Sequence, residues 1–217
     1  MANKMTKEQQ ELARGLIECG AFKDKTKSPE GKGFRYKIHD IKPELPLFPN
    51  YMDLRVIRSF PRLLSLAASE YVKLIHRQNW EYDYLADIPT GATPFTTLVS
   101  HFMSMKYISP RGDKKKHGSG AVIDGIYQKG DRVVVVDDLV SQGASKLETL
   151  DILKNEGLVP AGVVVLINRQ QGGDKELQKT GIPFASVFTL SELLDFYLSE
   201  KLMSKDIYEE SIKYIEK

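Results

Sequence analysis

Residues 132–145 read RVVVVDDLVSQGAS, and this segment constrains the fold more than any other in the chain. Four consecutive valines predict a strand that ends at residue 136 and is buried on both faces, as in the parallel sheets of α/β proteins. Two acids, Asp137 and Asp138, follow the valines, and a short polar turn leads into a helix predicted over residues 145–156. Such a strand–turn–helix unit favours a sheet covered by helices.

The chain from residue 59 onward alternates between strand and helix patterns. Strands are predicted at 82–88, 106–109, 121–127, 161–167 and 183–188, and helices after 61, at 94–103 and 174–179, and after 189 and 204. We therefore expect an α/β fold whose central, mostly parallel sheet is flanked by helices. In such sheets ligands bind beyond the carboxyl ends of the strands.

The N-terminal part has a different pattern and suggests a separate region. Thr6 and Gln9 have the spacing of a capping box, which predicts a helix from residue 6 to about 19. Residues 23–49 are rich in Lys, Gly and Pro and predict loops with one short strand at 34–38. The expected organisation is an N-terminal helix and hood at 1–50, a core at 51–200 and a C-terminal helix at 201–217.

Composition excludes several classes of protein. The single cysteine, Cys19, excludes an internal disulfide, and a cysteine-based metal site is not expected. A net charge of +2 does not favour a nucleic-acid partner, and no apolar run has the length of a membrane span. The start MANKMTKEQQ lacks the apolar core of a signal peptide, so a cytoplasmic protein is expected.

The residues that follow the valines have the chemistry of a sugar-phosphate site. Small and polar residues form the turn: Ser141, Gln142, Gly143, Ala144 and Ser145. Their backbone N–H groups and the helix N-terminus favour a phosphate. Asp137 and Asp138 can accept hydrogen bonds from ribose hydroxyls and hold a hydrated Mg²⁺. The alternative is that the two acids only begin a polar turn. Walker A and dinucleotide fingerprints are absent from the sequence.

This segment resembles the signature of type I phosphoribosyltransferases, in which a hydrophobic strand, two acids and a Ser/Thr/Gly-rich loop bind phosphoribosyl pyrophosphate (PRPP). The resemblance implies that fold, with a small N-terminal hood. It also implies that the two acids and the turn at 141–145 bind PRPP. The stretch DIPTGATP at 87–94 resembles the pyrophosphate loop of the family, with Thr90 and Gly91 facing the ligand.

Residues 109–120, SPRGDKKKHGSG, resemble the basic loop of orotate phosphoribosyltransferases. The residues in register are Arg111, Lys115, His117 and Gly118. The resemblance implies that Lys115 and His117 cover the pyrophosphate and that the loop reaches the neighbouring subunit of a homodimer. The catalytic residues implied are Arg111, Lys115, His117 and Asp138. Gly112 stands where the family has a lysine, and Lys114 is a candidate replacement at the PRPP site. The alternative is an exposed basic loop without a role.

Two more segments resemble the base-binding half of the same family. In INRQQGG at 167–173, Arg169 matches an arginine that binds the base, while Asn168 stands in place of an acid. PNYMDLR at 49–55 resembles the segment that enters the core, and Lys42 lies upstream of it. The resemblance implies that Arg169, Lys42 and Ser141 contact orotate.

The implied reaction joins orotate to the ribose of PRPP, with Mg²⁺, to give orotidine 5′-monophosphate and pyrophosphate in pyrimidine nucleotide biosynthesis. Three alternatives stay open on the sequence. In the first, the protein is a phosphoribosyltransferase that uses a purine or uracil in place of orotate. In the second, it is a PRPP-binding regulator without catalysis. In the third, it is a sugar-phosphate-binding domain without transfer activity.

Overall fold

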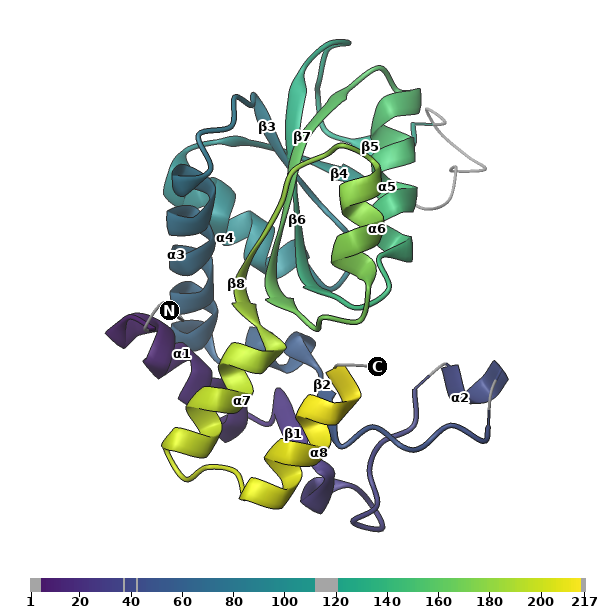
Figure 1. The fold of residues 1–217 in the computed structure, drawn as a ribbon. Coiled ribbons are helices and arrows are strands. Elements are labelled where there is room, and N and C mark those ends of the chain that lie inside the picture. Colours follow the sequence, from purple (N-terminus) through teal and green to yellow (C-terminus); the bar gives the residue numbers. More distant parts are fainter. Residues whose placement is uncertain (1–4, 37, 42, 112–120, 216–217) are drawn as a thin grey trace. The chain divides into compact units, whose positions relative to one another are not determined.

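The computed structural model describes residues 5–36, 38–41, 43–111 and 121–215. The chain divides into two compact units, shown in Figure 1. One unit comprises residues 64–189, and the other combines residues 1–63 with 190–217. Within the described ranges, no helix is long and apolar enough to cross a membrane.

The unit of residues 64–189 contains a six-stranded sheet. Its strands are β3 (Tyr84–Asp87), β4 (Lys106–Pro110), β5 (Ile123–Asp124), β6 (Arg132–Val140), β7 (Val159–Asn168) and β8 (Phe184–Thr189). Their order in the sheet is β5-β4-β3-β6-β7-β8. Only the short β5 pairs antiparallel, with β4. The expected α/β fold with a mostly parallel sheet is therefore confirmed.

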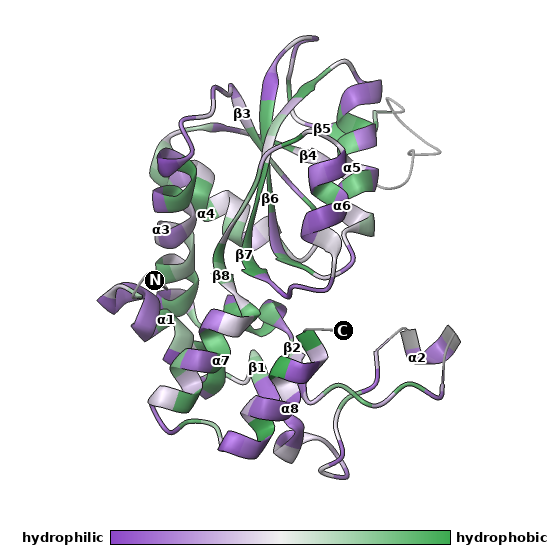
Figure 2. Cartoon of the chain, viewed as in Figure 1, coloured by the Kyte–Doolittle hydropathy of each residue, from purple (hydrophilic) through white to green (hydrophobic). Residues whose placement is uncertain are grey.

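Helices cover both faces of this sheet. Figure 1 shows α3 (Pro61–Arg77) and α4 (Thr93–Met103) on one side, and α5 (Ala144–Asn155) and α6 (Gly173–Lys179) on the other. The valines at 133–136 and the residues at 163–167 are fully buried, as predicted, and Figure 2 shows the hydrophobic character of the central strands. Val133 and Val135 belong to the same hydrophobic cluster as Leu150 and Leu153 of α5, so these two residues of β6 face that helix.

The strand order reverses between β3 and β6. Strands β3 and β6 are neighbours in the sheet. From β3 the chain continues to β4, which lies on the side of β3 away from β6, and from β6 it continues to β7, which lies on the side of β6 away from β3. The loops that follow β3 and β6 therefore diverge at their carboxyl ends, which is where open α/β sheets bind ligands. Both segments that the sequence singled out for phosphate chemistry, 87–94 and 137–145, leave the sheet at this position.

The second unit is built from short strands and helices. Its elements are α1 (Lys7–Glu18), β1 (Phe22–Asp24), η1 (Lys25–Lys27), α2 (Ile38–Ile41), β2 (Asn50–Met52), η2 (Leu54–Ser59), α7 (Leu190–Ser199) and α8 (Lys205–Ile215). The predicted capping box is confirmed, because the side chains of Thr6 and Gln9 exchange hydrogen bonds with each other's backbone N–H. Strands β1 and β2 pair antiparallel.

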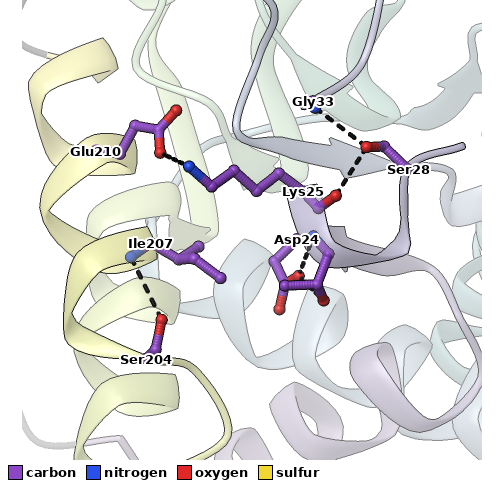
Figure 3. Close-up of polar contacts among 8 residues, drawn as sticks. Asp24, Lys25, Ser28, Gly33, Ser204, Ile207 and Glu210 are labelled. Atoms are coloured by element: carbon purple, nitrogen blue, oxygen red, sulfur yellow. Dashed lines mark hydrogen bonds and ion pairs between the residues drawn. The ribbon is translucent and has the colours of Figure 1, made fainter. Parts of the chain in front are cut away.

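Polar contacts tie η1 to its neighbours in this unit, as Figure 3 shows. The Lys25 ammonium pairs with the Glu210 carboxylate of α8. The Ser28 hydroxyl donates to the Lys25 carbonyl at 2.7 Å and accepts from the Gly33 N–H at 3.0 Å. Ser204 accepts weakly from the N–H of Ile207 at 3.5 Å, at the start of α8.

Two predicted strands differ from the structure. The strand expected at 34–38 is wrong: Phe34 and Phe48 form a single bridge, and the N–H of Tyr36 donates to His39 Nδ1 at 2.9 Å, which turns the chain toward α2. The strand expected at 121–127 is reduced to β5. It ends before Gly125, whose φ of +115° departs from strand geometry.

Candidate active site

Strand β6 does not end before the two acids, as the sequence suggested, but continues through them to Val140. The reason is its pairing with β7, which includes Asp137 with Val165, Leu139 with Ile167 and Val140 with Asn168. Consecutive residues of a strand point to opposite faces of the sheet. Asp137 and Asp138 therefore have different environments, although the sequence places them side by side.

The Asp137 carboxylate lies beneath the site, in the interior of the unit. Asp137 is 4% exposed, and its carboxylate forms an ion pair with the ammonium of Lys146, which is 5% exposed. The Tyr71 hydroxyl of α3 donates to the backbone carbonyl of Asp137 at 2.5 Å. Burial raises the pKa of the Asp137 carboxyl to about 7, and the neighbouring Lys146 ammonium limits that rise.

The Asp138 carboxylate lies at the loop that follows β3. A Cβ atom added to Gly91 would be 2.8 Å from Asp138 Oδ2, so only glycine leaves room for the carboxylate there. The N–H of Leu139 donates to Asp138 Oδ1 at 2.7 Å. Asp138 is half-buried, and Thr90 in the same loop is exposed. The structure thus brings together two predicted site segments that are about fifty residues apart in the sequence.

The turn after β6 leads into the N-terminus of α5. Gly143 has a φ of +86°, which favours glycine, and the helix begins at Ala144. Gln142, Ala144 and Ser145 are exposed. The first N–H groups of a helix have no partners within it, and they carry the positive end of the helix dipole. This turn has the geometry to receive a phosphate.

A glycine from another segment packs directly against this turn. The N–H of Gly173 donates to the carbonyl of Ser141 at 2.8 Å. A Cβ atom at Gly173 would be 2.6 Å from that carbonyl oxygen and 2.8 Å from the nitrogen of Gly143. Gly173, the second glycine of INRQQGG, therefore shapes the phosphate turn, a role that the resemblance alone did not reveal.

Arg169 follows β7 at the same edge of the sheet. Its N–H donates to the carbonyl of Val140 at 2.9 Å, and the residue is 4% exposed. Arg169 is therefore a buried arginine and not an exposed residue of a surface turn. Asn168, which stands in place of the expected acid, donates to the carboxylate of Asp174 at 3.2 Å, so an acid lies next to this position after all.

Comparisons with known proteins agree with this arrangement. The family model for the phosphoribosyl transferase domain matches residues 63–186. An orotate phosphoribosyltransferase of Caenorhabditis elegans is 33% identical over 169 residues, which cover 78% of this chain and 74% of that protein. The chain belongs to the orotate phosphoribosyltransferase family.

Solved structures share the fold of this family member. The UMP synthase of Leishmania donovani matches with a TM-score of 0.79 and 30% identity over 95% of the chain. The chain spans 42% of that longer protein. The orotate phosphoribosyltransferase of Francisella tularensis matches with a TM-score of 0.74 at 18% identity, over 98% of this chain and 97% of that one, which shows the shared fold.

The basic loop of the orotate phosphoribosyltransferase family is described here only at its start. The Arg111 guanidinium pairs with the Asp124 carboxylate of β5, and the backbone N–H of Arg111 donates to the carbonyl of Val122 at 2.8 Å. The other predicted loop residues lie outside the described residues: Lys114, Lys115, His117 and Gly118. Lys42, predicted to contact the base, also lies outside them.

The Asp138 carboxylate suits the kind of Mg²⁺ site that this family implies. The described part of the chain contains no cluster of three or more His, Cys, Asp or Glu side chains able to hold a metal ion. Mg²⁺ commonly keeps several waters and binds one or two carboxylates together with substrate phosphates, so a complete protein cage is not needed. Asp138, half-buried between the two loops, fits this pattern.

Proposed function

We propose that this protein transfers the 5-phosphoribosyl group of PRPP to orotate, which gives orotidine 5′-monophosphate and pyrophosphate. The observation that carries the proposal is the juxtaposition of Asp138, Gly91 and the α5 turn at the reversal point of the sheet, in a member of the orotate phosphoribosyltransferase family. The proposal places this chain in pyrimidine nucleotide biosynthesis.

The phosphoribosyl half of the site is assigned to the two loops. The turn of residues 141–145 would bind the 5-phosphate through backbone N–H groups and the hydroxyls of Ser141 and Ser145. The Asp138 carboxylate would accept hydrogen bonds from the ribose hydroxyls. Asp137 lies beneath the site, where its carboxylate pairs with Lys146. Thr90 and Gly91 would offer backbone N–H groups to the pyrophosphate. Bond breaking at the anomeric carbon builds positive charge on the sugar, so the protein needs no covalent nucleophile and acts by positioning and charge stabilisation.

Leaving-group stabilisation is assigned to the basic loop and to Mg²⁺. Lys115 and His117, with Arg111 and Lys114, would neutralise negative charge on the departing pyrophosphate. The ion, if held through water by the Asp138 carboxylate, would add a positive charge at the same phosphates, while the Asp137 carboxylate pairs with Lys146. The proposal includes a cytoplasmic homodimer in which the loop serves the neighbouring subunit. A monomer at assay concentration in analytical ultracentrifugation would contradict the dimer.

The base half of the site is assigned to Arg169, Lys42 and Ser141. Replacing Arg169 with lysine is expected to raise the KM for orotate about tenfold, because a single ammonium cannot form the paired hydrogen bonds that a guanidinium forms with a carboxylate. The KM for PRPP should change less than about twofold, the size of an ordinary surface effect. Steady-state kinetics with each substrate varied in turn would measure both.

The matched control for this variant is Arg132→Lys, since Arg132 is an exposed arginine that pairs with Glu81. The control should leave both KM values unchanged. Equal changes in the two KM values of Arg169→Lys would contradict the assignment of Arg169 to the base.

The direct test of the proposed function is loss of orotate absorbance in the ultraviolet after PRPP and Mg²⁺ are added. The rate should depend on all three components and should vanish when EDTA removes the metal. A panel of adenine, hypoxanthine, guanine and uracil, followed by pyrophosphate release, tests the alternative bases. Release with another base but not with orotate would overturn the base assignment. PRPP binding without release with any base would support a non-catalytic PRPP-binding protein instead.

A further inference from the structure

Asp87 is a fully buried carboxylate at the carboxyl end of β3, and the site described above does not use it. Its Oδ1 accepts from the hydroxyl of Ser109 at 2.5 Å, and its Oδ2 accepts from the hydroxyl of Thr93. The side chain of Tyr107 also hydrogen-bonds to it. Among the described residues, each of these partners is a hydroxyl group, so several hydrogen bonds, rather than an ion pair, stabilise the buried carboxylate.

A carboxylate in the interior carries a large desolvation cost unless its oxygens are hydrogen-bonded. Hydrogen bonds to an ionised acceptor are stronger and more directional than those between neutral groups. Burial, and next the negative charge of Asp87, raise the pKa of Tyr107 well above its ordinary value, so the phenol stays protonated and remains a donor. The arrangement therefore fixes the segments that supply the hydroxyls.

The two oxygens of Asp87 hold different segments. Thr93 is the first residue of α4, so the bond from Asp87 to Thr93 closes the loop of residues 88–92 at its base. Ser109 lies in β4, two residues before Arg111. The closed loop contains Gly91, against which the Asp138 carboxylate packs. Asp87 thus sets the position of this loop relative to Asp138 and to the end of β4.

We propose that Asp87 is a positioning residue for pyrophosphate: it holds the loop of residues 88–92 so that the backbone N–H groups of Thr90 and Gly91 meet the leaving group. The inference rests on the proposed function, because that function places pyrophosphate at this loop. Asp87 does not touch the ligand itself. Its effect is therefore expected on the affinity for pyrophosphate and PRPP and not on the affinity for the base.

The test is Asp87→Asn, which keeps the size of the side chain but removes the charge and one acceptor oxygen. Calorimetric titration of the protein with magnesium pyrophosphate should show affinity weakened about tenfold, the loss expected for weakened hydrogen bonds to a charged group. The KM for PRPP should rise by a similar factor, whereas the KM for orotate should change less than about twofold. Unchanged pyrophosphate affinity, or equal changes in both KM values, would overturn the proposal.

Two further variants keep the test decisive if Asp87→Asn does not fold. Thr93→Val and Ser109→Ala each remove one hydroxyl and leave the carboxylate, and Thr93→Val should reproduce the selective loss of pyrophosphate affinity. A Thr93→Val variant with wild-type affinity would overturn the proposal. The matched control is Asp195→Asn, because Asp195 accepts from the Tyr208 hydroxyl at 2.7 Å in the other unit. This control should leave every binding constant unchanged.

The same titration separates the inference from the proposed function. Wild-type protein that binds pyrophosphate but does not convert orotate would refute the proposed reaction, and the Asp87 variants would still show whether Asp87 positions the loop. Wild-type protein that binds no pyrophosphate would refute both.

Discussion

Replacing Lys146 with methionine is expected to lower the free energy of unfolding by about 3–5 kcal/mol, the usual cost of leaving one partner of a buried ion pair uncompensated. Lys146 and Asp137 are both almost fully buried, and their charged groups pair with each other. Methionine retains an aliphatic chain of similar length but no charge. The variant therefore tests the charge of Lys146 rather than the space that the side chain fills.

The destabilisation should depend on pH. The folded-state pKa of Asp137 is raised to about 7 from an ordinary value of 3.8, so the folded state binds more protons between these values. The extra proton bound by Asp137 in the folded state stabilises the fold; this stabilisation is complete below pH 4 and is lost as the pH rises through 7. Without Lys146 the pKa of Asp137 rises further. The difference between variant and wild type should therefore be largest above pH 7 and small near pH 5.5.

Urea unfolding of the ligand-free protein at pH 5.5 and pH 8, followed by circular dichroism, measures both effects. The matched control is Lys179→Met, which removes an exposed ion pair with Glu176 and should cost less than about 1 kcal/mol. Asp137→Leu in the Lys146→Met background should recover stability, because it removes the uncompensated charge. A cost for Lys146→Met that equals the control at pH 8 would contradict the importance of the pair.

The sequence predicted most of the fold because its signals are local. Four valines at 133–136 and the Val-rich stretch at 163–167 specify buried strands, and both are fully buried. Thr6 and Gln9 specify the start of α1 through bonds that involve only neighbouring residues. The end of β6 could not be located in this way. It depends on pairing with β7, and aspartates are poor strand formers on their own.

The N-terminal region was harder to predict for a related reason. Phe34 pairs with Phe48, fourteen positions later in the chain, and between them the His39 side chain accepts from the Tyr36 N–H. Long-range bridges of this kind leave no periodic pattern in the sequence. The strands β1 and β2, each three residues long, were also not anticipated.

The candidate site shows the same division between local and long-range signals. The acids and the phosphate turn were predicted from their sequence neighbours, and Arg169 was predicted from the resemblance of INRQQGG to the base-binding segment of the family. Lys146 was missed, although a signal existed: Thr149, Leu150 and Leu153 are buried at three, four and seven residues after it. That spacing places Lys146 on the inward face of α5, where a lysine needs a partner. Likewise, Asp87 ends a strand whose residues are all buried.

Replacing Asp138 with asparagine is expected to lower kcat/KM for PRPP by about 10- to 100-fold. The proposed role of Asp138 is to accept hydrogen bonds from ribose hydroxyls, and a hydrogen bond to a charged group contributes about 1.5–3 kcal/mol. Asparagine has nearly the same size, so it fits against Gly91, where the carboxylate now packs. It loses the negative charge that binds ribose and the hydrated metal. Orotate does not contact Asp138 in the proposed site, so the KM for orotate should change little.

Initial rates with PRPP varied at saturating orotate and Mg²⁺ would measure this effect. Asp131→Asn is the matched control, since Asp131 accepts from a backbone N–H, that of Gln128, in a turn at the opposite end of β6. The variant and the control should have the same midpoint of thermal unfolding within about 2 °C, because asparagine keeps the size of the half-buried Asp138 side chain. PRPP kinetics of Asp138→Asn that match the control would remove Asp138 from the ribose site. Because Asp138 lies at the meeting point of both loops, that result would also remove the geometric basis of the proposed transfer reaction.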